Sequence, residues 1–122
     1  MAGSQNGDRE QAGAQVGTIR FELEAAAELA EAASWYEARL SGLGRRLLDE
    51  VEHLLAVLAS RPGAFPRLAD TTPNLGLRRA LLPRFPFALV FFEAGGEIRV
   101  VAVAHARRQP GYWLYRIVGN SK

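Results

Sequence analysis

The spacing of apolar residues changes once along this chain, and that change restricts the possible folds more than any other feature. Between Ala26 and Leu58 the apolar residues recur at helical spacing in two blocks, which are separated by Ser41-Gly42-Leu43-Gly44 and ended by Pro62-Gly63. Between Leu77 and His105 they are nearly continuous, in runs as long as a strand. The sequence therefore predicts two helices in an antiparallel hairpin, followed by a group of strands.

Each predicted helix carries its larger apolar residues along one stripe. We expect the stripe of the first helix to comprise Ala26, Leu29, Ala30, Ala33, Tyr36 and Leu40. We expect the stripe of the second helix to comprise Leu47, Leu48, Val51, Leu54, Leu55 and Leu58. These stripes are the surfaces by which the hairpin would pack on a sheet.

Four strands are predicted, one before the hairpin and three after it. Residues Thr18–Leu23 alternate between apolar and charged, as in a strand with one buried face. The other strands are Leu77–Leu82, Phe87–Glu93 and Glu97–His105, and Ala94-Gly95-Gly96 is the tight turn between the last two. The order β-α-α-β-β-β predicts an α+β fold, in which the helical hairpin packs on one face of a small, antiparallel-rich twisted sheet. The nearly continuous apolar strands predict burial on both faces over part of their length.

The chain has 122 residues, enough for one domain, and its composition excludes several kinds of site. We expect residues 1–17, which are polar and rich in Gly, Gln and Ala, to be a disordered leader. Residues 18–118 would form the domain and residues 119–122 a short tail. The chain has no cysteine, and its two histidines, His53 and His105, are too few for a metal site, so we expect no metal and no cofactor. No apolar run approaches the roughly 20 residues that cross a bilayer, and the N-terminus has no apolar signal segment, so we expect a cytoplasmic protein without membrane contact.

Charge is distributed unevenly along the chain. Residues 1–60 have a net charge of −5, whereas residues 61–122 have a net charge of +7, and nearly all the basic residues are arginines. By strand alternation, one face of the last strand is expected to carry Arg99, Val101, Val103, His105 and Arg107. The sheet face that the hairpin leaves uncovered would then be basic, and would suit RNA phosphates or an acidic protein segment. The alternative is an ordinary solvated basic surface.

Residues near the end of the last predicted strand are of the types that support phosphoryl transfer. Arginine would stabilise the charge that develops on a phosphate, and histidine or tyrosine would move protons. These residues are His105, Arg107, Arg108 and Tyr112. In the alternative interpretation, His105 makes a structural hydrogen bond, while Tyr112 and Trp113 pack the C-terminal segment against the core.

Exposed aromatic residues and arginines are the candidates for contact with a protein partner. We expect this contact to involve Trp35, Arg78, Arg99, Arg108 and Trp113. A purely structural use of Trp35 within the helical hairpin is the alternative.

Five stretches together resemble the RelE/ParE superfamily of type II toxins, over Ile19 to Arg116. They are Ala33-Ser34-Trp35-Tyr36, Gly42-Leu43-Gly44, Arg61-Pro62-Gly63-Ala64-Phe65-Pro66, Arg84-Phe85-Pro86-Phe87-Ala88-Leu89-Val90-Phe91 and Val100-Val101-Ala102-Val103-Ala104-His105-Ala106-Arg107-Arg108. The resemblance implies a ParE-like, plasmid-stabilisation toxin that inhibits bacterial growth. It also implies a cognate antitoxin, encoded beside the toxin, whose flexible segment wraps it.

The resemblance leaves the target of such a toxin open. RelE-type members resemble mRNA endonucleases that act on the ribosome, and Arg107 and Tyr112 match the Arg and Tyr that follow their last strand. Ala88 and Leu81, however, stand where those members carry Arg and Lys, and an alanine cannot neutralise a phosphate. We therefore expect a ParE-like toxin that is not itself an enzyme and binds DNA gyrase. The alternative that the resemblance implies is a ribosome-dependent mRNA endoribonuclease. Its catalytic residues would be Arg79, Arg84, His105, Arg107 and Tyr112, around the scissile phosphate. A non-toxic, antitoxin-binding relative is the third interpretation.

Overall fold

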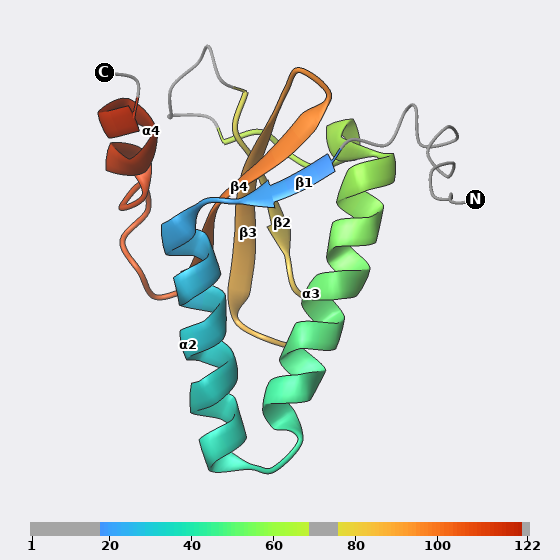
Figure 1. The fold of residues 1–122 in the computed structure, drawn as a ribbon, viewed down its shortest axis with the longest axis vertical. Helices are drawn as coiled ribbons and strands as arrows, with labels where there is room; N and C mark the ends of the chain where they lie inside the picture. The colour runs from blue at the N-terminus through green and yellow to red at the C-terminus, as the bar shows by residue number, and fades with distance from the viewer. Residues whose placement is uncertain (1–17, 69–75, 121–122) are drawn as a thin grey trace, which may run out of the picture.

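Two helices form a hairpin on one side of a four-stranded sheet in the computed structural model, which describes residues 18–68 and 76–120 (Figure 1). The elements are β1 (Thr18–Phe21), α2 (Leu23–Arg39), α3 (Leu43–Ser60), the 3-10 turn η2 (Pro62–Ala64), β2 (Arg78–Leu81), β3 (Phe87–Ala94), β4 (Glu97–His105) and α4 (Leu114–Asn120). This order and layering confirm the predicted α+β class. The predicted leader, residues 1–17, lies outside the described residues, and α4 continues into the stretch predicted as a tail. Within the described part of the chain, no helix is long and apolar enough to cross a membrane.

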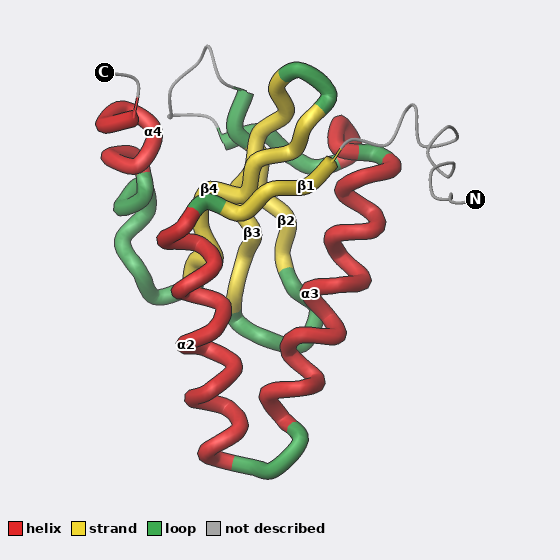
Figure 2. Tube along the Cα trace, viewed as in Figure 1, coloured by secondary structure: helices red, strands yellow, loops and turns green. Residues whose placement is uncertain are grey.

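The sheet has the strand order β1-β4-β3-β2 (Figure 2). β1 runs parallel to β4, while β4 with β3 and β3 with β2 are antiparallel, as expected for an antiparallel-rich sheet. The predicted turn between β3 and β4 is confirmed, with Gly95 and Gly96 at φ values of 59° and 75°. Two consecutive residues with positive φ match the right-handed twist of the strands they connect, which explains the pair of glycines.

The first strand is shorter than predicted, because the chain becomes helical at Leu23 and not after it. Glu22 still donates its backbone N–H to the carbonyl of Val100 at 2.9 Å, but its own carbonyl accepts the N–H of Ala26 at 3.0 Å. Glu22 is thus the last residue bonded to the sheet and the residue that begins α2. Leu23 has no place in the sheet, and its side chain is exposed.

The main core lies between the hairpin and the sheet. Leu47, Val51 and Leu58 of α3 are buried there, as predicted. Of the stripe predicted for α2, Leu29, Ala33 and Tyr36 pack against this core, but the residues that α2 buries fully are Ala25 and Ala32. Ala26, Ala30 and Leu40 are exposed, which corrects the prediction for this helix. The reason is that apolar residues cover much of the circumference of α2, so their spacing alone does not determine which of them face the sheet.

A bulge in β4 changes the faces on which its later residues lie. Val90 pairs with Ala102, but Phe91 pairs with Val100, so Val101 is the extra residue. Arg99 and Val101 therefore lie on the sheet face away from the hairpin, whereas Val103 belongs to the core beneath it. The prediction that Arg99, Val101, Val103, His105 and Arg107 share one face is wrong, because strict alternation does not continue through a bulge.

The second face of the sheet has an apolar centre that the C-terminal segment covers, which corrects the prediction of an uncovered basic face. Leu77, Val90, Phe92 and Val101 form a second core there, and the C-terminal segment packs on it through Trp113, which is only 5% exposed. Burial on both faces, predicted from the nearly continuous apolar strands, is thereby confirmed.

Candidate partner-binding surface

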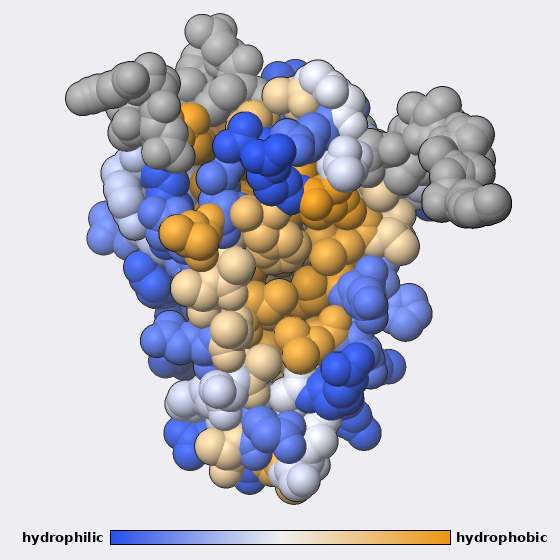
Figure 3. Space-filling model, in the orientation of Figure 1, coloured by the Kyte–Doolittle hydropathy of each residue, from blue (hydrophilic) through white to orange (hydrophobic). Residues whose placement is uncertain are grey.

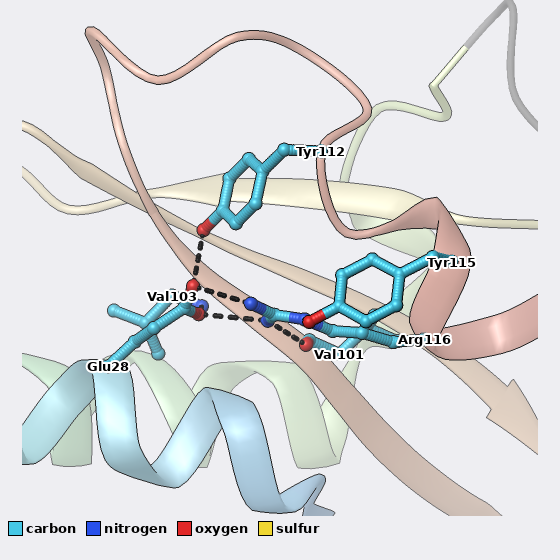
Figure 4. A network of polar contacts seen from close by, with 6 residues as sticks. All are labelled: Glu28, Val101, Val103, Tyr112, Tyr115 and Arg116. Atoms are coloured by element: carbon cyan, nitrogen blue, oxygen red, sulfur yellow. Dashed lines mark hydrogen bonds and ion pairs between the residues drawn. The ribbon is translucent and has the colours of Figure 1, made fainter. Parts of the chain in front are cut away.

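A single carboxylate, that of Glu28 on α2, joins the helical hairpin to β4 and to the C-terminal segment (Figure 4). Its Oε1 accepts hydrogen bonds from the Val103 N–H at 2.9 Å and from Arg116 Nη1 at 3.1 Å. Its Oε2 accepts hydrogen bonds from the Tyr112 hydroxyl at 2.7 Å and from Arg116 Nη2 at 2.8 Å. Arg116, which is only 7% exposed, also donates to the carbonyl of Val101 at 3.0 Å. This network holds the C-terminal segment against α2 and β4.

The network shifts the pKa values of Glu28 and Tyr112 in opposite directions, so that the carboxylate stays ionised and the phenol stays protonated. Burial raises the pKa of Glu28, but the hydrogen bonds from Arg116, Tyr112 and Val103 outweigh it, so the pKa of Glu28 is lowered. Burial, together with the hydrogen bond to Glu28, raises the pKa of Tyr112 above its ordinary value. The Tyr112 hydroxyl therefore stays protonated and gives its proton to a hydrogen bond within the protein, which is unfavourable for a general base.

The five nuclease candidates do not converge on one site. His105 accepts the backbone N–H of Arg107 through Nδ1 at 3.0 Å, the structural role that was the alternative for it. Its ring packs edge-on against Phe87, on the hairpin side of the sheet. Arg79 of β2 pairs with Val90 of β3 and lies with it on the sheet face away from the hairpin. The sheet therefore separates Arg79 from His105. Arg84 lies in the loop before β3, where its Nη1 is 3.8 Å from Oε2 of Glu50.

Two of the five candidates for partner contact are engaged within the chain, and a third is buried. Arg78 donates to the carbonyl of Phe65 at 2.6 Å. Arg99 forms an ion pair with Glu22, to which its Nε donates at 2.8 Å. Trp113 is buried in the second core, so its side chain packs the C-terminal segment and is not on the surface. The indole of Trp35 is half exposed, and the exposed guanidinium of Arg108 is stacked 3.8 Å from the ring centroid of Tyr112.

Glu28 and Arg116 make the densest polar network among the described residues, and neither was predicted as a site residue. A signal for Glu28 does exist in the sequence. Ala25 and Ala32, the residues that α2 buries, lie three before and four after it, so Glu28 lies on the same face as the two buried alanines. A carboxylate on a buried helix face requires partners, but the sequence does not identify them.

Two concave regions flank α2. An apolar groove of about 850 Å³ runs between α2 and α3, and Figure 3 shows apolar side chains along it. Its lining includes Phe21, Ala26, Leu29, Ala30, Ala33 and Leu48. A second cavity, of about 420 Å³, lies between α2, the sheet and the C-terminal segment. We call it the aromatic hollow, and its apolar lining consists of Ala32, Trp35, Tyr36, Phe87 and Val103.

Comparison with known proteins places the fold. No protein-family model matches the chain, and no curated protein matches it. Among solved structures, a chain described as "Chromosomal ParDE TA system from P. aeruginosa" superposes with a TM-score of 0.62 and 20% sequence identity. The match covers 76% of this chain and 99% of that chain. The hairpin and sheet described above are therefore similar in fold to a chain of a ParDE toxin–antitoxin system.

Proposed function

We propose that this protein is the toxin of a bacterial type II toxin–antitoxin system, that it inhibits growth by binding its target, and that a cognate antitoxin neutralises it. The observation that carries the proposal is the fold shared with a chain of a ParDE system over 76% of this chain. The apolar groove between α2 and α3 supports it, because an amphipathic partner segment packs its apolar face into such a groove.

The arrangement of the candidate residues favours a toxin that binds over one that cleaves RNA. Tyr112 uses its hydroxyl to bond Glu28, and Arg79 and His105 lie on opposite faces of the sheet. Ala88, at the position where the resemblance places an arginine in nucleases, is buried. We therefore expect a ParE-like activity in the cytoplasm, with DNA gyrase as the target and no bond-breaking step by the toxin itself.

The proposal is tested by inducing the gene in a bacterial host without its neighbouring gene and measuring colony-forming units. We expect growth arrest, and recovery when the neighbouring gene is expressed as well. Arg79→Ala and Tyr112→Phe are expected to remain toxic, since neither residue has a catalytic task in a binding toxin. Purified protein is expected to inhibit supercoiling by DNA gyrase. Normal colony growth at high expression would instead favour the non-toxic, antitoxin-binding relative.

One observation favours the endoribonuclease as a second candidate. Arg107 and Arg108 lie two and three residues after His105, and among the described residues neither has a carboxylate at ion-pair distance. Primer extension on mRNA in a cell-free translation reaction separates the two functions. Discrete cuts that require ribosomes and disappear with Arg107→Ala would establish cleavage, whereas an unchanged mRNA together with growth arrest supports binding.

A further inference from the structure

The aromatic hollow is formed before any partner arrives. Tyr36, at its base, makes edge-to-face contacts with Phe85 and Phe87, at centroid distances of 5.0 Å and 6.4 Å. Trp35 forms an outer wall, 52% exposed, and packs edge-on against Tyr36 at 5.0 Å. Because these rings support one another, an incoming side chain would meet an apolar surface whose shape is already set.

The charged groups around the hollow differ in whether they are free to bind a partner. The carboxylate of Glu28 lines the hollow but is fully used by Arg116, Tyr112 and Val103. Arg108 also lines it and is held in place by stacking on Tyr112 at 3.8 Å. A guanidinium stacked on an aromatic ring keeps its N–H donors free for a carboxylate. Glu31 of α2, exposed and lining the same hollow, is the remaining acid there, so a negative group would bind at the Arg108 end.

We infer that the aromatic hollow is the anchor site for one large apolar side chain of an acidic partner segment, with a neighbouring carboxylate of that segment bound by Arg108. In protein interfaces a few residues supply most of the binding energy, and tryptophan, tyrosine and arginine are enriched among them. The aromatic hollow combines these three residue types in one concave surface. The inference rests on the proposed function, because the partner that would supply the segment is the antitoxin.

The probe for the hollow is 3-phenylpropionate, which joins an aromatic ring to a carboxylate, and its matched control is 3-phenylpropylamine. Each is titrated into the full-length, isotopically labelled protein while amide and indole N–H resonances are recorded. We expect 3-phenylpropionate to shift the Trp35 indole signal and the amides of Val103 and Arg108 in a saturable way. The amine is expected to bind more weakly, because it lacks the carboxylate and brings a positive charge beside Arg108.

Two variants make the test specific. Arg108→Glu is expected to weaken 3-phenylpropionate about fivefold, the size expected for an exposed charge pair. Trp35→Ala is expected to abolish saturable binding, and both residues are exposed enough for the fold to survive their replacement. Arg61→Glu makes the same charge change at the end of α3 and is expected to leave binding unchanged. Tighter binding of the amine, shifts confined to the groove between α2 and α3, or an unaffected Arg108→Glu variant would each overturn the inference.

The failure of this inference can be distinguished from failure of the proposed function. Growth arrest without binding of 3-phenylpropionate would reject the anchor site and leave the toxin assignment in place. Binding without growth arrest would retain the anchor chemistry and reject the toxin. If both hold, the purified complex with the product of the neighbouring gene is expected to have lost the 3-phenylpropionate site, and retention of that site would overturn the assignment of the occupant.

Discussion

Glu28 is the residue whose loss is expected to cost most stability, because its carboxylate accepts four hydrogen bonds from three residues. In Glu28→Ala, the buried guanidinium of Arg116 loses its ion pair, and the donors of Tyr112 and Val103 lose their acceptor. Removing one partner of a buried ion pair typically destabilises a protein by about 3 kcal/mol or more. We expect the free energy of unfolding, measured by urea denaturation, to fall by that amount.

The matched control at the residue scale is Glu52→Ala on α3. Glu52 is an exposed helical glutamate, and no hydrogen bond or ion pair of its side chain is found in the described part of the chain. Its replacement is expected to change stability by less than about 0.5 kcal/mol. Equal effects of the two substitutions would mean that the Glu28 network does not stabilise the fold.

The close contact between α2 and α3 depends on Gly44, in the first turn of α3. A Cβ at this position would lie 2.5 Å from the carbonyl oxygen of Ala33 and 3.1 Å from the Cβ of Glu37. Glu37 also accepts the N–H groups of Gly42 and Gly44, at 2.8 Å and 2.9 Å, and so caps α3 from the end of α2. Gly44→Ala would push the helices apart and disturb this cap, and we expect a loss of about 2 kcal/mol in thermal or urea unfolding.

The matched control for Gly44→Ala is Gly63→Ala, in η2. Nothing lies within 4 Å of a Cβ placed there, and its φ is not positive. Gly63→Ala is therefore expected to be neutral or slightly stabilising, since alanine restricts the unfolded chain more than glycine does. If the two substitutions had the same effect, a general effect of glycine replacement would explain the result better than the contact between the helices.

Low pH is expected to reduce the free energy of unfolding of the whole domain, because Glu28 connects the hairpin, the sheet and the C-terminal segment. Its pKa is lowered from the ordinary value of 4.5, so its contribution to stability is fully present above pH 4.5 and is lost as the pH falls through the lowered pKa. Glutamine does not titrate, so the Glu28→Gln variant lacks this pH-dependent contribution to stability. We expect wild type to lose more stability than Glu28→Gln between pH 7 and pH values below 4.5, and parallel losses would contradict the argument.

Much of the fold could be predicted from the sequence because its signals are local. The breaks at residues 41–44 and at Pro62, the turn at Gly95-Gly96, and the change from helical to strand spacing each depend on neighbouring residues. The bulge at Val101 was not predicted, since the inserted residue is as apolar as its neighbours and leaves no trace in the spacing. That one residue moved Val103 and His105 away from the face assigned to Arg99.

The candidate site was less predictable than the fold. Tyr112 and Arg107 were selected for their chemistry, but a side chain's chemistry does not reveal which atoms surround it. The hydroxyl of Tyr112 bonds a carboxylate 84 residues away in the sequence, and Arg116 bonds the same carboxylate across 88 residues. Packing of the C-terminal segment through Tyr112 and Trp113 is observed, and the sequence offered it as an alternative without a reason to prefer it.

The sequence by itself determined the helical hairpin, the order of the four strands around it, the turn between the last two strands and the uneven distribution of charge, whereas the C-terminal helix α4 was not predicted. The tertiary structure alone decided which side of α2 faces the sheet, which face of β4 each residue occupies, and which charges are paired. The physical reason is that secondary structure follows from interactions between residues close in the chain, whereas burial and ion pairing depend on segments brought together by folding. Glu28 illustrates the difference: it is one of several glutamates along a helix, until β4 and the C-terminal segment close around it.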